Sequence, residues 1–353
     1  MPFTRRKFIE LAVILSLQSG ALAGDAYKWS VQYLIDTSQS MFGKPMKVYP
    51  RHNRGLAISP DGKYLYAGYL HSFDGRGEVR RLAIDVPDYE RAVTEVLPGI
   101  PAKAITVDDK GRVYMTSQNL VVVYDADLEH RLFKINAGEC DGVCAVREGG
   151  VLVLYATERN ECVLQRFVLT EKGGEITAAK PGGFDGSGVF RIPGCADARN
   201  VKADAKGNLW VADLGGNKVF RIRKDAKDLK SVEVHSPIDM AFDKDRIFVT
   251  RWQERSITVL DNDMNVLGNL NVPWEELELS PFGNNQLGAL SGIVVVPGKG
   301  FFVANEGGQT ANQKSTYGKV DSFSDMVDGK LYRDIKNDDN DPILRATVVS
   351  TGP

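Results

Sequence analysis

Residues Ala198–Ile222 read ARNVKADAKGNLWVADLGGNKVFRI, and the pattern of this stretch returns five more times along the chain. Each copy has a small residue, an apolar run, a turn with Asp or Gly, a second apolar run with an aromatic residue, and a polar loop. Two apolar runs joined by a tight turn predict a pair of antiparallel strands. The other copies begin at Arg54, Lys103, Gly142, Ile238 and Ser291.

Further strands are expected after each pair. A third alternating segment is found at Glu78–Asp85, Leu120–Asp127, Asn217–Lys224 and Ser256–Asp263, and a fourth such as His130–Ile135 is expected in most copies. A four-stranded sheet cannot bury both faces alone, so the units must stack, and radial stacking closes a ring without an exposed edge. The sequence therefore predicts an all-β fold, a six-bladed β-propeller of four-stranded antiparallel blades.

The fourth copy also carries a family resemblance. Its segment Gly207–Ile222 resembles the repeats of the NHL and SMP-30/gluconolactonase-like propellers, with their Gly-Asn, aromatic-Val-Ala-Asp and Asn-Lys-Val form, and the resemblance covers about Arg54–Glu306. It implies the same six-bladed fold. In the calcium-dependent lactonases of the SMP-30 family an axial ring of Glu, Asn and Asp holds a metal that polarises the lactone carbonyl. Many NHL propellers are instead non-catalytic binding or scaffold proteins.

Residues 1–23 are predicted to be an export signal. A Thr-Arg-Arg-Lys-Phe-Ile stretch from Thr4 precedes the apolar run Leu11–Leu17, and Ala21-Leu22-Ala23 forms a small-x-small cleavage site. The two arginines resemble a twin-arginine signal, and the alternative is an ordinary secretory signal. The run is too short to span a bilayer. We therefore expect a periplasmic or secreted bacterial protein with no membrane span, a monomer.

Residues 24–353 are expected to form a single propeller domain. The strand-like segments Ser30–Asp36 and Ala346–Thr351 bracket the repeats, so one should complete a sheet begun by the other. The formal charge is −2, from 44 basic and 46 acidic residues, and no long basic run occurs. This composition argues against nucleic acid as a partner.

Four cysteines cluster in the third repeat and at the start of the fourth: Cys140, Cys144, Cys162 and Cys195. In an oxidising compartment such clustering favours one disulfide. Cys144 falls inside an innermost strand and is expected to be buried. Cys140 and Cys195 occupy corresponding positions of neighbouring repeats and are the first choice for a bridge, with Cys162 the competing partner.

Functional residues are expected where the loop before the first strand and the loop after the second emerge on one face. Alignment of the copies places Arg54, Lys103 and Arg199 at the same position there, and Arg251 and Trp252 in the second loop of the fifth copy. Cations directed at one point suit a carboxylate or sulfate, with bidentate contacts from arginine. The sequence thus predicts a small anionic organic or carbohydrate ligand.

A divalent metal is the alternative for the same face, because calcium accepts amide and carboxylate oxygens in flexible geometry. The candidate oxygen donors are Asn53, Asp141, Asn200, Asp239 and Glu306. With such a metal the protein would be a hydrolase or lyase, including a calcium-dependent lactonase, with His71 or Asp239 as catalytic residue. The neighbouring cations argue against this ion.

Two further interpretations stay open for this face. Arg199 could merely pair with Asp239 or Asp213 and have a structural role, and the propeller could be a scaffold without catalysis. Three insertions, Glu171–Ala196, Asn271–Leu290 and Gly307–Tyr317, are expected to rise on the ligand face, where extra loop length commonly forms pocket walls.

Overall fold

A computed structural model of the 353-residue chain describes residues 13–14, 25–33, 51–71, 76–86, 89–252, 254, 256–272, 290–297, 299–305, 326–327, 330–331 and 343–350. Nearly all regular structure in these ranges is β-strand. The exceptions are one helical turn, α1 (Tyr89–Ala92), and one 3-10 turn, η2 (Phe184–Gly186). No helix in the described part of the chain is both long and apolar enough to cross a membrane.

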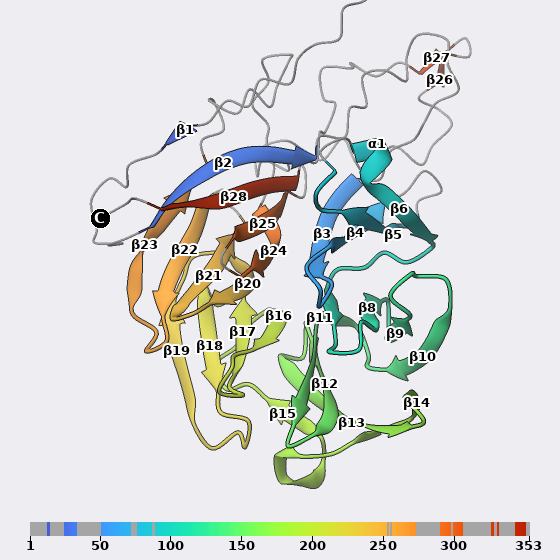
Figure 1. Ribbon diagram of the computed structural model, residues 1–353. Helices are drawn as coiled ribbons and strands as arrows, with labels where there is room; N and C mark the ends of the chain where they lie inside the picture. Colours follow the sequence, from blue (N-terminus) through green and yellow to red (C-terminus); the bar gives the residue numbers. More distant parts are fainter. Residues whose placement is uncertain are drawn as a thin grey trace, which may run out of the picture.

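Six sheets, each built on four antiparallel strands, surround a common axis (Figure 1). This confirms the predicted six-bladed β-propeller. Blade 1 comprises β3 (Arg51–Ile58), β4 (Tyr64–His71), β5 (Glu78–Ala83) and β6 (Val93–Pro98). Blade 2 comprises β7 (Ile105–Val107), β8 (Val113–Ser117), β9 (Leu120–Tyr124) and β10 (Arg131–Asn136). Blade 3 comprises β11 (Cys140–Glu148), β12 (Val151–Glu158), β13 (Val163–Lys172) and β14 (Glu175–Pro181), with β15 (Val189–Arg191) also paired to β13.

The second half of the ring continues in the same way. Blade 4 comprises β16 (Ala198–Ala203), β17 (Leu209–Asp213), β18 (Lys218–Ile222) and β19 (Leu229–Glu233). Blade 5 comprises β20 (Pro237–Asp243), β21 (Arg246–Arg251), β22 (Ser256–Asp261) and β23 (Val266–Asn271). The innermost strands contact one another in ring order, and β24 of blade 6 touches both β20 and β3.

Blade 6 joins strands from opposite ends of the sequence. Its inner strands are β24 (Leu290–Val296) and β25 (Gly300–Asn305), and β28 (Ile343–Ser350) and β2 (Asp25–Tyr33) follow outward. The pair β2 and β28 lies side by side over its full length in Figure 1. The prediction that one terminal strand completes the sheet of the other is confirmed.

Three short strands lie outside the blade pattern: β1 (Val13–Ile14), which pairs with β2, and the hairpin of β26 (Met326–Val327) and β27 (Lys330–Leu331). Apart from β1, the predicted export signal lies outside the described residues.

Aspartates hold the turns between first and second strands. The carboxylate of Asp204 accepts hydrogen bonds from the Asn208 backbone N–H at 2.8 Å and from the Trp210 indole N–H at 3.0 Å. Asp108 does the same in blade 2, where the Tyr114 hydroxyl donates to it at 2.9 Å. A short carboxylate that bonds its own following backbone stabilises such a turn. This explains why these repeats carry an Asp in the turn and an aromatic residue in the following strand.

A separate hydrophobic cluster fills the space between each pair of neighbouring blades. Each sheet therefore buries both faces, which a four-stranded sheet achieves only by stacking on its neighbours. Each second strand has at least one aromatic residue that is fully buried in these clusters: Tyr66, Tyr114, Tyr155, Trp210, Phe248 and Phe302.

The segment Glu171–Ala196 corrects one expectation. It does not rise as a loop on the ligand face, because β14 and β15 within it pair with the two halves of β13 and form the outer edge of blade 3. The segment is long because this edge is made of two short strands. The insertions Asn271–Leu290 and Gly307–Tyr317 lie almost entirely outside the described residues.

The expected bridge between Cys140 and Cys195 is wrong for this structure. The Cys140 thiol points to blade 2, with its Sγ 3.7 Å from the Leu120 carbonyl oxygen, while Cys195 packs on the cluster between blades 3 and 4. The strand pairing of β11 shifts between Cys140 and Gly142. Such a bulge reverses which face the following side chains occupy, so Cys140 lies on the opposite face of the sheet from the other cysteines.

Candidate functional site: a cationic axial pocket

Five of the innermost strands have a β-bulge or similar register shift near their first residues. In blades 1, 3, 4, 5 and 6 the register shifts within the first residues of β3, β11, β16, β20 and β24. A bulge re-aims the residue that it inserts. The residues inside the shifts all line one pocket: Arg54, Asp141, Arg199, Asn200, Ile238, Ser291 and Gly292. Lys103, just before β7, and Asp239 complete its lining.

Threonine hydroxyls from the second strands support this irregular backbone. The Thr157 hydroxyl donates to the Arg199 carbonyl oxygen of the next blade. The Thr250 hydroxyl donates to the carbonyl oxygen of Ser291 at 2.6 Å, and Thr116 accepts the backbone N–H of Lys103 at 3.1 Å. Buried backbone groups outside the regular ladder need such partners. The positions of the pocket side chains are thus fixed by hydrogen bonds behind them.

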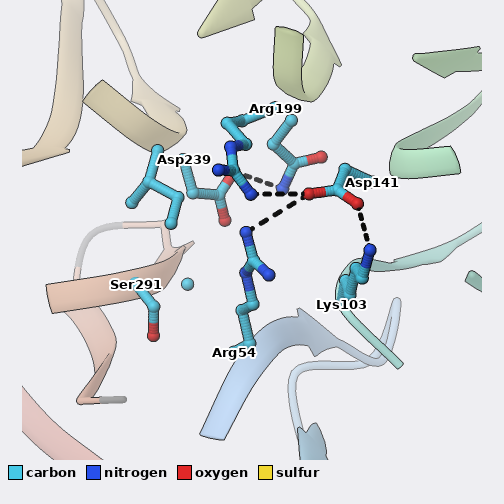
Figure 2. Close-up of a pocket in the computed structure, with 9 residues that line it drawn as sticks. Arg54, Lys103, Asp141, Arg199, Asp239 and Ser291 are labelled. Carbon is cyan, nitrogen blue, oxygen red and sulfur yellow. Dashed lines mark hydrogen bonds and ion pairs between the residues drawn. The ribbon is translucent and has the colours of Figure 1, made fainter. Parts of the chain in front are cut away.

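Three cationic side chains converge on the carboxylate of Asp141 (Figure 2). The ammonium Nζ of Lys103 is 2.5 Å from Oδ1, Nη1 of Arg199 is 2.8 Å from Oδ2, and Nη2 of Arg54 is 3.4 Å from Oδ2. The Asp141 side chain is only 1% exposed, whereas that of Lys103 is 27% exposed. Lys103 therefore lies on the solvent side of the group.

The charges of this group are coupled. Burial opposes ionisation of Asp141, but Arg54, Lys103 and Arg199 outweigh it and lower the pKa of its carboxyl. Burial and the repulsion of Arg54 lower the pKa of Arg199, with Asp141 and Asp197 acting in the opposite sense. The charged side chains that line the pocket are three cations and the two aspartates Asp141 and Asp239, and a partly enclosed site strengthens the attraction of its cations for a negative group.

A second carboxylate orients Arg199 from behind. Asp197 Oδ2 lies 2.8 Å from Arg199 Nη2, and Asp197 Oδ1 lies 2.8 Å from Nε of Arg159. Arg199 therefore pairs with Asp141 and Asp197, and the suggested pairing with Asp239 or Asp213 is not found. Asp213 instead accepts the backbone N–H groups of the loop before β16, including that of Asp197 at 2.7 Å.

Three of the five proposed metal ligands already use their oxygens for other partners. Both oxygens of Asp141 are bound by cations. Asp239 Oδ1 accepts the Asn200 amide at 2.6 Å and its Oδ2 accepts the backbone N–H of Ile293 at 3.1 Å, and the Asn200 oxygen accepts the N–H of Val201. Burial raises the pKa of Asp239, against the counteracting charge of Lys202. The described residues contain no group of three acidic, His or Cys side chains suited to a metal.

The open space between the lining side chains is small. About 10 Å³ is available to the centre of a water-sized molecule, which is room for about one water molecule or monatomic ion. Only a small anion, or one oxygen of a larger anionic group, fits between these side chains as they stand.

The other residues singled out from the sequence lie outside this pocket or outside the description. Arg251 ends β21 and pairs with Glu254, and the following Trp252 does not line the pocket. Asn53 is fully buried, and none of the described residues hydrogen-bonds its amide. His71 ends β4, paired with Arg51, and its side chain lies outside the description, as does Glu306.

Sequence reasoning missed the supporting residues Asp197, Thr116, Thr157 and Thr250. A signal for the threonines was present, because three of the six second strands carry Thr near their ends, as MTS, ATE and VTR. No comparable repeat marks Asp197, whose role follows from the fold of the loop before β16.

Comparisons with known proteins agree with the fold and leave the family open. No protein-family model matches the chain, and no curated protein matches it in sequence. The chain is similar to a chain of a nidogen/laminin complex (15% identity, TM-score 0.50, covering 69% of this chain and 84% of that one). It is similar to the WD40 repeats of RRP9 (11% identity, TM-score 0.50, covering 83% and 79%). It also matches virginiamycin B lyase from Staphylococcus aureus (15% identity, TM-score 0.49, covering 94% of each chain).

At such identities the likeness bears on the fold alone. Fold and pocket together define the class of this protein: a six-bladed β-propeller with a cationic pocket on its axis.

Proposed function

We propose that this protein is an exported, NHL/SMP-30-like propeller that binds a small anion, or the anionic end of an organic or carbohydrate ligand, in its axial pocket. The observation that carries the proposal is the convergence of Arg54, Lys103 and Arg199 on the single carboxylate of Asp141. Lys103 is the most exposed of the three cations, and Asp141 Oδ1 accepts one of the three N–H donors of its ammonium. An incoming carboxylate or sulfate oxygen would satisfy donors that Asp141 leaves over.

Binding is better supported than catalysis. A hydrolase or lyase would need a base or a metal-bound water beside the ligand. The two acidic side chains of the pocket, Asp141 and Asp239, already use their oxygens for cations and N–H donors. A calcium-dependent lactonase would in addition need an oxygen cage, which the donor set of this pocket does not supply.

Anion titrations test the proposal directly. Chloride, acetate, sulfate and gluconate are titrated by calorimetry and by thermal shift at constant ionic strength. Lys103→Met keeps the apolar stem of the most exposed cation and removes its charge, so we expect at least about tenfold weaker binding, since a hydrogen bond to a charged group contributes about 1.5–3 kcal/mol. Lys110→Met is the matched control, because Lys110 lies in the turn between β7 and β8 and pairs with Glu171.

Two outcomes contradict the proposal. If none of the four anions stabilises the protein, or if Lys103→Met binds as tightly as Lys110→Met, the pocket is a structural ion-pair cluster. If calcium stabilises the wild-type protein and EDTA removes ligand binding, the metal alternative replaces the anion. Export is tested separately, by the mass of the protein from the periplasm or medium, which should correspond to a chain beginning near Gly24.

A further inference from the structure

A tight turn brings Cys195 back toward Cys162. β15 pairs with the start of β13, and the Ile192 backbone N–H donates to the Cys162 carbonyl oxygen at 2.9 Å. Three residues later the Cys195 N–H donates to the Ile192 carbonyl oxygen at 3.3 Å. Pro193 and Gly194 lie between them, and Gly194 has φ 74°. Proline followed by a left-handed glycine is the sequence of a type II turn, so this reversal is encoded locally.

Both cysteines pack on the cluster between blades 3 and 4, where the Cys162 thiol lies 3.8 Å from the Arg159 carbonyl oxygen and next to Cys195. Burial and the neighbouring Cys162 thiol raise the pKa of Cys195. The other two cysteines are placed differently. Cys140 points to blade 2, and Cys144 lies within β11 at the centre of the same cluster, where burial raises its pKa to about 11.

We propose that Cys162 and Cys195, free thiols in this structure, are the pair that forms a disulfide in an oxidising environment. The oxidant is a disulfide of small-molecule or dithiol-protein type. One thiolate attacks it and releases one thiol, and the second thiolate then attacks the mixed disulfide and releases the other. Two protons and two electrons leave the cysteine pair, and the oxidant is reduced to two thiols. Because burial suppresses the thiolate, the bond forms as the chain folds rather than afterwards.

This bond would fasten a contact of the axial pocket. Cys162 follows Arg159 closely, and its backbone N–H donates to the Arg159 carbonyl oxygen at 3.3 Å. Cys195 precedes Asp197 by two positions. Arg159 and Asp197 form the ion pair behind Arg199. A disulfide between these two segments would therefore hold together the two parts of the chain that orient Arg199. The proposal itself does not depend on what the pocket binds.

Peptide mapping tests the pairing without any mutation. The full chain is unfolded, refolded with reduced and oxidised glutathione, alkylated, and digested with trypsin. Cleavage separates the cysteines into peptides 160–166 (NECVLQR), 192–199 (IPGCADAR) and 135–147, which carries both Cys140 and Cys144. We expect a cross-linked species of the first two peptides. Two results would overturn the proposal. One is that Cys162 and Cys195 are still alkylated after oxidative refolding, and the other is a cross-link from peptide 192–199 to peptide 135–147.

Thermal unfolding gives a second measurement. The closed loop spans 34 residues, counted from Cys162 to Cys195. Its closure should raise the Tm of the oxidised protein by about 5 °C over the reduced protein. Cys195→Ser should lose this difference, and Cys140→Ser should keep it. An equal difference in Cys195→Ser and in the wild type would contradict the pairing, and the peptide map decides the question if either variant fails to fold.

Discussion

Arg54 and Asp141 are separated by 87 positions and belong to blades 1 and 3, yet Nη2 of the arginine lies 3.4 Å from Oδ2 of the aspartate. Lys103 of blade 2 and Arg199 of blade 4 bind the same carboxylate. Asp141 therefore ties four of the six blades together at the axis. It also acts as an internal anion, which competes with any negative ligand for the cations around it.

Replacing this internal anion should change both stability and binding. Asp141→Asn removes the carboxylate that the three cations share, and we expect the free energy of unfolding to fall by about 3–5 kcal/mol, the usual cost of breaking a buried ion pair. Acetate or chloride should restore part of the loss and raise the Tm of the variant more than that of the wild type. Denaturant and thermal unfolding with and without the anion measure both effects.

Glu161→Gln is the control for this variant, because Glu161 forms a solvent-exposed pair with Arg191 and such pairs contribute little. Equal responses of wild type and Asp141→Asn to added anion would show that Asp141 does not occupy an anion site.

The hydroxyl of Thr250 should stabilise the pocket backbone. It donates to the Ser291 carbonyl oxygen at 2.6 Å and accepts the Asp239 backbone N–H at 3.2 Å. Thr250→Val preserves the shape but leaves these buried groups without a partner, so we expect a loss of about 1–3 kcal/mol in the free energy of unfolding. Thr250→Ser keeps the hydroxyl and should lose less. Chemical denaturation distinguishes the two, and equal losses would mean that the methyl group rather than the hydroxyl matters.

Gly142 should tolerate no side chain. A Cβ atom at this position would lie 2.5 Å from the Arg199 carbonyl oxygen and 2.7 Å from Asn200 Cα, both in the backbone of the next blade. Gly142→Ala must push blades 3 and 4 apart, and overpacking of this kind costs about 1–3 kcal/mol. Gly182→Ala is the control, since its Cβ would meet only Val168 at 3.4 Å. Unfolding curves that shift equally for both variants would contradict the close approach.

The carboxylate of Glu171 should make stability depend on pH. Hydrogen bonds from Arg147, opposed by partial burial and reinforced by Lys110 and Arg112, lower the pKa of Glu171 to about 2. A lowered pKa in the folded state adds stability above the unfolded value near 4.5, and this stability is lost as the pH falls toward 2.

The Glu171→Gln variant measures this contribution. The Glu171 side chain is 18% exposed, so solvent screening reduces the stability that its charge contributes. We therefore expect the free energy of unfolding of the variant to be lower by about 1–2 kcal/mol at pH 7. The difference in the free energy of unfolding between the variant and the wild type should be smaller at pH 3 than at pH 7. A difference that is constant between pH 7 and pH 3 would exclude the carboxylate charge as its cause.

The fold could be predicted from the sequence because each repeat carries a local pattern that is typical of a β-hairpin. An Asp in the turn accepts a hydrogen bond from the aromatic residue six positions later in two of the hairpins, as in Asp204 and Trp210 or Asp108 and Tyr114. The convergence of Arg54, Lys103 and Arg199 on one pocket also followed from their shared repeat position.

The rest of the site depended on details that no repeat displays. The bulge at Asp141 places Cys140 on the opposite face of β11 from Cys144, so the predicted bridge from Cys140 to Cys195 was wrong. Asn53, next to Arg54, is likewise absent from the pocket lining. The partner of Arg199 could not be found from alignment either, because no other copy has an acidic residue at the position of Asp197.

The construction of blade 6 gives this propeller a particular order of assembly during synthesis. β2 is synthesised before the strands of blades 1 to 5 and β28 more than three hundred residues after β2, yet the two strands are neighbours, with Asp25 opposite Ser350. Blades 1 to 5 contain only strands adjacent in sequence and can form as they emerge. β2 precedes these five blades and gains its partner β28 only after all of them have been made. The long loop that must close before this pair forms makes the pairing a slow step, so β2 spends longer without its neighbouring blade strand than any strand of blades 1 to 5.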